Sequence, residues 1–354
     1  MAELSLCMIV RNEADVLARC LASVGTLADE IVIVDTGSTD GTLEIARQFT
    51  NCVYEIPWAD DFAAARNVSF QKATKPFLMW LDADDVIERE DFKRLQQLKR
   101  ELTPTVDAVY LLYHTNFDAA GTPTFSYYRE RIVKNDAKFR WVGEVHETIT
   151  VGQNCWYRDA AISHKKQKPS DGERNLRILR KIKASRAWNA REHFYYGTEL
   201  FYHGDYAEAA EELRLYLHRA DGWTENRIEA CKFLYYALRK LHCDQSAVQA
   251  LYESFCYDLP RAEICCELGY YYESRKEWAF AAYWFTAALG KTPNYRSGAF
   301  VLKDCYDYVP YLELSVCSYW LGDVAKAKEY NRLAEICKPH SAACRHNREF
   351  YSRL

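Results

Sequence analysis

Three carboxylates end an apolar run in the stretch LMWLDADD at residues 78–85. Asp82, Asp84 and Asp85 carry like charges that repel one another, and each loses hydration where a strand ends in a cleft. Two interpretations fit the stretch alone. One is a solvated turn after a strand, where Asp is common. The other is a seat for a hard divalent cation, which takes oxygen ligands and lets neighbouring carboxylates coexist.

The segments that must position these carboxylates alternate between apolar strands and helical patterns through residues 1–163, the first predicted domain. The pattern predicts strands at 4–10, 30–37, 52–56 and directly before Asp82, and helices at 13–27, 38–49 and 61–73. Ser38 or Thr39 is the candidate N-cap of the second helix. Near-continuous apolar strands joined by helices predict a parallel sheet that is covered on both faces.

Polar residues gather where these predicted strands end. Arg11, Asn12 and Glu13 follow the first strand, Asp35 ends the second, and Asp82 follows the fourth. In open α/β sheets, ligands bind outside the carboxyl ends of the strands. The shared edge therefore favours a binding site over a solvated turn for the three aspartates.

The second half of the chain, residues 193–354, is helical and repetitive. Small residues and aromatics recur at the spacing of tetratricopeptide helix pairs in three segments, 196–213, 268–293 and 313–339. A degenerate unit that ends at Pro260 fills the gap between the first two. Small residues let paired helices approach and aromatics fill the space between repeats. We therefore assign the many tyrosines to the core and not to a cofactor.

A basic segment at 164–192 separates the two predicted domains. Ten Lys or Arg residues against two acidic ones lie between His164 and Arg191. A linker with a solvated helix face is the simpler interpretation. The alternative is that some of these cations meet phosphate or an acidic acceptor.

Composition excludes several classes of protein. The formal charge of −4 argues against nucleic acid as the main partner. No apolar run reaches the roughly 18 residues that a membrane span needs. The 13 cysteines form no CxxC pair, and no signal-peptide pattern opens the sequence. We therefore expect reduced thiols and a cytoplasmic protein.

Four segments together resemble the family 2 glycosyltransferases with the GT-A fold: MIVRNEADVL, VIVDTGSTDGT, WADDFAAARN and LDADD. A fifth, WVGEVHE at 141–147, matches a signature of lipopolysaccharide core transferases in that family. Residues 3–150 carry the resemblance. In the architecture of the whole chain it resembles bacterial transferases in which tetratricopeptide-like repeats follow this domain, a group that includes enzymes that glycosylate bacteriocin peptides on Cys or Ser. The resemblance implies a Rossmann-like, mixed, mostly parallel sheet.

The resemblance also implies a nucleotide-sugar donor, most often UDP-linked. Asp35 is suited to accept a hydrogen bond from a pyrimidine N–H, and residues Val10, Arg11, Asn12 and Glu13 approach the base and ribose. Arg66 is expected to reach uracil or pyrophosphate, with an ion pair to Asp60 or Asp61 as the alternative. The loop DTGSTDG is not GxGxxG, which argues against a dinucleotide oxidoreductase.

The aspartates then gain a chemical role. A divalent ion held by Asp84, with Asp82 or Asp85 assisting or touching the ribose, bridges the donor phosphates and stabilises the leaving group. His146 is the candidate imidazole ligand. Mg²⁺ and Mn²⁺ both suit this donor set, and an imidazole tilts the balance towards Mn²⁺.

Members of the family invert the anomeric centre, which calls for a general base when the acceptor is an alcohol. Glu147 and Glu144 compete for this role. The family signature includes Glu147 and leaves the position of Glu144 variable, which favours Glu147. The alternative is that Glu147 only orients His146. A Cys acceptor needs less help from a base.

The sequence is compatible with more than one acceptor and more than one class of function. Repeat surfaces that hold extended peptides suggest a peptide or protein acceptor, and a glycan is the other choice. A second class of function is a non-catalytic interaction scaffold with a degenerate transferase domain, against which the intact LDADD, DTGS and VHE motifs argue. A sugar nucleotidyltransferase is a third, but its Gly-rich amino-terminal loop has no counterpart in MIVRNEADVL.

Overall fold

The computed structural model describes residues 2–118, 121–167, 171–298 and 300–354. The chain forms two compact units, Met1–Ser185 and Arg186–Leu354. Within the segment 164–192, His164 ends strand β10 and Arg174–Ser185 form helix α5, which belongs to the first unit. Residues 168–170 of that segment lie outside the described residues.

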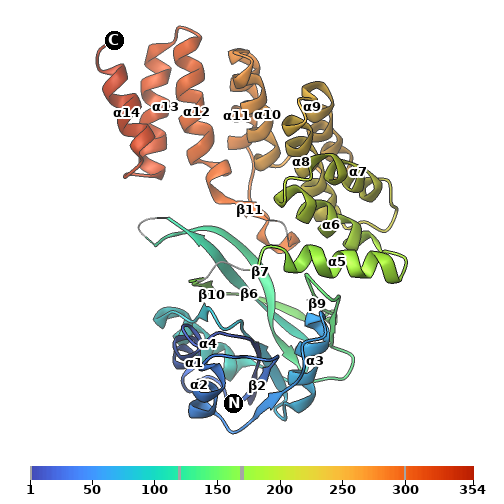
Figure 1. The fold of residues 1–354 in the computed structure, drawn as a ribbon. Helices are drawn as coiled ribbons and strands as arrows, with labels where there is room; N and C mark the ends of the chain where they lie inside the picture. Colours follow the sequence, from blue (N-terminus) through green and yellow to red (C-terminus); the bar gives the residue numbers. More distant parts are fainter. Residues whose placement is uncertain (1, 119–120, 168–170, 299) are drawn as a thin grey trace. The chain divides into compact units, whose positions relative to one another are not determined.

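One mixed sheet organises the first unit (Figure 1). The strands of this unit run in the order β3-β2-β1-β4-β7-β6-β10-β5. Their bounds are β1 Leu4–Val10, β2 Glu30–Asp35, β3 Val53–Glu55, β4 Phe77–Trp80, β5 Asp85–Val86, β6 Ala108–Phe117, β7 Pro123–Lys134 and β10 Cys155–His164. A separate two-stranded sheet pairs β8 (Trp141–Val142) with β9 (Thr148–Ile149).

The parallel part of the sheet confirms the predicted strand–helix alternation. Strand β1 pairs in parallel with β2 and β4, and β2 pairs in parallel with β3, so these strands end at one edge. Strand β7 is antiparallel to both β4 and β6, so the sheet is mixed and not wholly parallel. The interleaved helices are α1 Leu17–Val24, α2 Thr42–Phe49, α3 Phe62–Lys72 and α4 Arg89–Glu101.

Each face of the sheet has its own apolar core. Leu6 and Met8 of β1 pack in a cluster with buried residues of α1 and α4, whereas Cys7 packs in the opposite cluster with Phe70 of α3. Successive residues of a strand point to opposite faces, so a strand that is buried on both sides reads as a continuous apolar run. This explains the sequence LSLCMIV.

One predicted cap is wrong. Helix α2 begins at Thr42 with Gly41 as its N-cap residue, and neither Ser38 nor Thr39 caps it. The Ser38 hydroxyl instead accepts a hydrogen bond from the Asn12 amide, 2.9 Å away, and the Thr39 amide donates to the Asn12 side chain. These loop residues therefore join the ends of β1 and β2.

Antiparallel helix pairs build the second unit. The described pairs are α6 Ala190–Tyr202 with α7 Tyr206–Leu217, α8 Thr224–Lys240 with α9 Asp244–Glu253, α10 Ala262–Ser274 with α11 Trp278–Leu289, and α12 Tyr308–Trp320 with α13 Val324–Cys337, followed by α14 Ala342–Tyr351. A Cβ atom built on Gly269 of α10 would lie 2.6 Å from the Phe285 ring of α11. Small residues thus permit the close helix contacts that the repeat pattern predicts. Every described helix is too short or too polar to cross a bilayer.

Candidate active site

The LDADD stretch forms a turn between β4 and β5 that is held by its own hydrogen bonds. The Asp85 amide donates to the Asp82 carbonyl, and the Asp82 amide donates to the Asp85 carboxylate, both at 3.0 Å. The side chain of Asp82 is 34% exposed and that of Asp84 is 21% exposed, whereas Asp85 is fully buried. The three carboxylates therefore differ in what they can reach.

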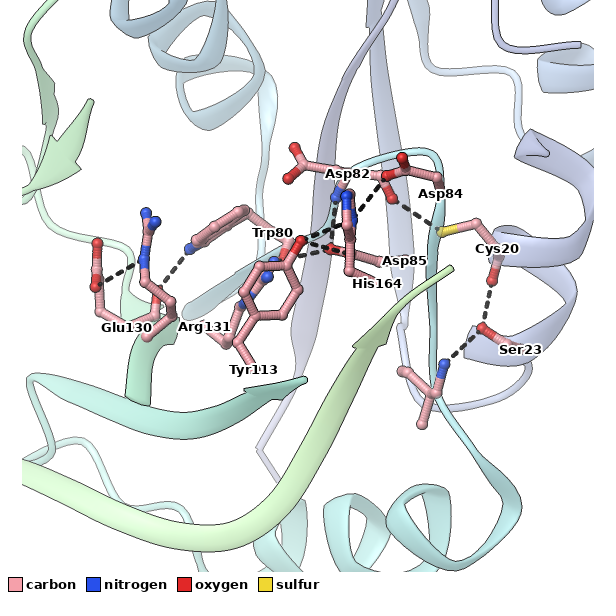
Figure 2. A network of polar contacts seen from close by, with 12 residues as sticks. Cys20, Ser23, Trp80, Asp82, Asp84, Asp85, Tyr113, Glu130, Arg131 and His164 are labelled. Carbon is pink, nitrogen blue, oxygen red and sulfur yellow. Dashed lines mark hydrogen bonds and ion pairs between the residues drawn. The ribbon is translucent and has the colours of Figure 1, made fainter. Parts of the chain in front are cut away.

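Strand β10 brings an imidazole to this turn (Figure 2). His164 is the antiparallel register partner of Asp85, and its Nδ1 lies 3.2 Å from Asp84 Oδ1 and 3.3 Å from Asp85 Oδ1. Among the described residues, Asp84, Asp85 and His164 are the one cluster of three side chains suited to hold a metal ion, with ligand atoms within 4.8 Å of one another. His146 and Asp82 are not members of it.

The donor set fits a divalent cation of the Mn²⁺ or Mg²⁺ type. Adjacent ligands of an octahedral ion with bonds of about 2.1 Å lie about 3 Å apart, close to the separation of the Asp84 oxygen and the His164 nitrogen. Burial lowers the pKa of His164, but Asp84 and Asp85 outweigh it and raise the pKa to about 10. A proton on His164 therefore balances carboxylate charge in the metal-free protein.

One guanidinium links this turn to the predicted base. Arg66 of α3 donates from Nη2 to Asp82 Oδ1 and from Nε to Glu147 Oε1, both at 2.7 Å. Its guanidinium also lies over the rings of Trp80 and Trp141, at 5.0 and 4.8 Å. Arg66 therefore does not pair with Asp60 or Asp61, the alternative that the sequence left open.

Arg66 and a second buried arginine, Arg131 of β7, hold Asp82 in its ionised form. Burial raises the pKa of the Asp82 carboxyl, but the charges of Arg66 and Arg131 outweigh burial and lower it to about 2. Asp82 is therefore a carboxylate throughout the neutral range, with one oxygen already bound to Arg66.

The loop between β8 and β9 carries the other sequence candidates. The Glu144 carbonyl accepts from the Phe62 amide at the start of α3, at 2.9 Å. His146 adopts a left-handed backbone with φ of 52°, a conformation that is uncommon for residues other than glycine. Glu147 follows it and faces Arg66. Of this loop, the structure thus joins Glu147 to the aspartate turn, and does not place His146 in the metal-ligating cluster.

The ends of β1 and β2 gather the predicted nucleotide residues. Val10 and Asp35 are register partners, and the Glu13 amide donates to the Thr42 hydroxyl at 2.7 Å. Asp35 is 1% exposed, and its Oδ1 accepts from the amides of Gly37 and Ser38. Among the described residues, Asp35 Oδ2 is one of the few buried polar side-chain atoms without a hydrogen-bond partner. Arg11 is exposed beside them.

Sequence reasoning missed His164, Arg131 and Tyr113. Tyr113 on β6 donates to Asp85 Oδ1 at 2.9 Å, and Arg131 on β7 forms an ion pair with Asp85 Oδ2 at 3.0 Å. A usable signal was the histidine that ends the apolar strand AAISH, because a polar residue at a strand end marks a candidate site in the same way as Asp35.

Comparisons with known proteins identify the family of the first unit. Residues 5–164 match the family described as glycosyl transferase family 2. This part of the chain is a family 2 glycosyltransferase domain. The repeats that follow it form the C-terminal tetratricopeptide-like part.

Three relatives illustrate the similarity. A TPR repeat-containing protein of Synechococcus elongatus is 37% identical over 42% of this chain and 36% of its own length. The glycosyltransferase SunS of Bacillus subtilis is 24% identical over 62% of this chain and 54% of its own. The lipopolysaccharide core biosynthesis glycosyltransferase LpsC of Rhizobium meliloti is 32% identical over 30% of this chain and 39% of its own. The chain thus spans between about a third and about a half of the length of each of these relatives.

Proposed function

We propose that this protein is a metal-dependent, inverting glycosyltransferase that uses a nucleotide-sugar donor, with UDP as the nucleotide. The observation that carries the proposal is the arrangement around Arg66. One guanidinium holds the candidate base Glu147 and, through Asp82, the turn whose next carboxylate, Asp84, lies beside His164. Base and metal ligands therefore belong to one bonded network at the carboxyl edge of the sheet.

We assign the donor base to the residues at the ends of β1 and β2. A buried carboxylate oxygen without a partner is costly unless a ligand donates to it. Asp35 Oδ2 meets this description. An N–H group of uracil is a donor of the required kind, whereas cytosine presents an acceptor nitrogen at the equivalent ring position. This difference supports UDP over CDP.

Asp84 and His164 are the residues that would hold the cation. A divalent ion there supplies counter-charge to the diphosphate leaving group. Asp82, bound to Arg66, is left to touch the donor ribose or to assist the cation. Asp85 is fully enclosed by protein donors. His146 remains a prediction from the sequence, which the His164 cluster does not require.

In the reaction, an acceptor hydroxyl attacks the anomeric carbon from the face opposite the diphosphate. The new sugar–oxygen bond forms while the bond to the diphosphate oxygen breaks, so the configuration inverts. Glu147 takes the acceptor proton, and Arg66 keeps the Glu147 carboxylate oriented towards it. Glu144 lies three residues away in the same loop and is the second candidate for this role.

The acceptor is proposed to be a peptide, a protein or a glycan. One of the relatives is a lipopolysaccharide core biosynthesis glycosyltransferase, and another is a TPR repeat-containing protein. A helical repeat surface suits extended peptides. The repeats of this chain are therefore proposed to take part in acceptor binding.

A donor screen tests the proposal. The full chain is incubated with UDP-, GDP-, dTDP- and CDP-sugars in the presence of Mn²⁺, Mg²⁺ or EDTA, and the release of nucleotide is measured. We expect release from UDP-sugars with metal and none with EDTA. If no nucleotide is released and UDP with Mn²⁺ does not raise the melting temperature, the chain is an interaction scaffold instead.

A further inference from the structure

A second arginine, Arg131 on β7, pairs with Asp85 of the aspartate turn and has no part in the proposed chemistry. Its side chain is fully buried, and Nη1 donates to Asp85 Oδ2 at 3.0 Å and to the Trp80 carbonyl at 3.3 Å. Its guanidinium lies 3.8 Å from the centre of the Trp80 ring and 4.1 Å from that of Tyr113. Figure 2 shows the side chain among these residues.

This burial is costly. Among the described residues, Arg131 Nε and Nη2 are buried without a hydrogen-bond partner. Taking a charge out of water costs several kcal/mol, and one ion pair with incomplete hydrogen bonding often fails to offset that cost. Two aromatic faces contribute part of the difference. An apolar pair of similar volume would serve stability alone at least as well, so the charge is expected to have another use.

The partner of Arg131 shows what that use is. Asp85 accepts hydrogen bonds on both oxygens: Oδ2 from Arg131 and the Asp82 amide, and Oδ1 from Tyr113, with His164 Nδ1 a further 3.3 Å contact. These contacts leave Asp85 little capacity to bind a cation. Although it belongs to the metal-ligating cluster, Asp85 is placed to hold the other members of the site.

We propose that Arg131 is a positioning residue. Through Asp85 it fixes His164 and the Asp82–Asp84 turn at the separation that a divalent cation needs, without itself touching metal or substrate. This inference rests on the proposed function, because it assumes that Asp84 and His164 hold a cation. It predicts that the Arg131–Asp85 pair controls metal affinity more than it controls folding.

The two features of arginine that matter can be separated by substitution. Arg131→Lys keeps the charge beside Asp85 but loses the planar group that stacks between two rings. Arg131→Met combined with Asp85→Asn removes both charges at nearly constant volume, and neutral replacement of a buried ion pair is often tolerated by the fold. Arg131→Met alone leaves Asp85 buried without its counter-charge and is not used.

Lys99→Met is the matched control. Lys99 is a buried cation of the same unit, paired with Asp29 at 2.6 Å. Asp29 accepts from the amide of Leu4, the first residue of β1, so this pair lies at the opposite edge of the sheet. Its loss should lower stability without changing the metal site.

The experiment measures Mn²⁺ affinity directly, by the loss of the free-ion electron paramagnetic resonance signal, and the melting temperature of each full-length variant. We expect the Arg131→Met/Asp85→Asn protein to bind Mn²⁺ at least tenfold more weakly than the wild type, as is typical when the partner of a metal ligand is removed. Arg131→Lys should lose less Mn²⁺ affinity than the double variant, because it keeps the charge beside Asp85. Lys99→Met should bind Mn²⁺ like the wild type.

Two outcomes would overturn the inference, and they differ. Wild-type Mn²⁺ affinity in both Arg131 variants, with Asp84→Asn still abolishing binding, would leave the proposed function standing and reduce Arg131 to a structural residue. No Mn²⁺ binding by the wild type would overturn the proposed metal site and this inference together. If the double variant fails to fold, the Mn²⁺ affinity of Arg131→Lys tests the inference: weaker binding than the wild type supports it, and wild-type affinity overturns it.

Discussion

Arg66 and Glu147 lie 81 residues apart in the sequence, yet Arg66 Nε donates to Glu147 Oε1 at 2.7 Å. The side chain of Glu147 is only 12% exposed, and that of Arg66 is 8% exposed. An ion pair that is sheltered from water is screened little by salt and holds a defined geometry. The pair therefore orients the Glu147 carboxylate, which the same guanidinium links to Asp82 of the aspartate turn.

Replacing Glu147 with Gln should lower kcat of transfer to a hydroxyl acceptor by about 10²–10⁴-fold, because an amide cannot take the acceptor proton. Donor KM should change little, since Gln still accepts from Arg66 and the nucleotide residues are untouched. Glu144→Gln is the matched control and should retain most activity. The reverse pattern would move the base to Glu144, and wild-type kcat in both variants would show that neither glutamate takes the acceptor proton.

The strand ends could be predicted because burial on both faces imposes continuous apolar runs that stop at a polar residue. The ends of these runs put Val10, Asp35 and Asp82 at one edge of the sheet from the sequence pattern alone. The helix cap at Ser38 or Thr39 failed because these residues bond to Asn12 across the loop, and a tertiary contact outweighed the local preference.

Pairings between distant segments could not be predicted. His164 reaches Asp84 only because β10 runs antiparallel to the two-residue strand that the aspartate turn forms, and nothing local in LDADD specifies that partner. Likewise, the charge of Arg66 was evident, but its two carboxylate partners come from a different strand end and a different loop. Side-chain chemistry was therefore easier to predict than the contacts that organise it.

His164→Ala and His146→Ala separate the two candidate imidazole ligands. We expect His164→Ala to weaken Mn²⁺ binding at least tenfold, because neutral imidazole is a common metal ligand in proteins and the His164 nitrogen already lies 3.2 Å from the Asp84 carboxylate. His146→Ala should bind Mn²⁺ normally. Isothermal titration calorimetry with Mn²⁺ measures the affinity of both variants. A loss of affinity confined to His146→Ala would restore the assignment of His146 that was made from the sequence.

Asp35→Asn tests the donor site with little change in shape. The remaining oxygen can still accept from the Gly37 and Ser38 amides, while the partnerless Oδ2 becomes an NH₂ donor that faces the donor group of uracil. Loss of one such hydrogen bond costs about 1–3 kcal/mol, so donor KM should rise roughly ten- to hundredfold with a smaller change in kcat. Unchanged KM for the UDP-sugar would remove Asp35 from the base site.

Gly269→Ala tests the close packing of the repeats. The added methyl would lie 2.6 Å from the buried Phe285 ring, and overpacking of this kind typically costs about 1–3 kcal/mol. Gly290→Ala is the control, because the nearest atom to its new Cβ would be 3.7 Å away. Chemical denaturation followed by circular dichroism should show a lower unfolding midpoint for the first variant only. Equal midpoints would mean that α10 and α11 can move apart without cost.

The helical repeats should become less stable as the pH rises from about 4.5 to about 7. Burial and the nearby charge of Glu273 raise the pKa of Glu313 on α12 to about 7, above the ordinary value of 4.5 that it regains on unfolding. Between about pH 4.5 and pH 7 the folded state therefore binds more protons than the unfolded state, and stability falls with increasing pH. The pKa values of Glu267 and Glu273 are raised by burial as well, so these residues act in the same direction. Glu313→Gln has no carboxyl group to titrate, and its melting temperature should exceed that of the wild type by an amount that grows from near zero at about pH 4 to on the order of a few degrees at about pH 8. Scanning calorimetry of both proteins across this range provides the measurement. A difference that is constant with pH, or that shrinks as the pH rises, would show that Glu313 is ionised at little cost in the folded repeats.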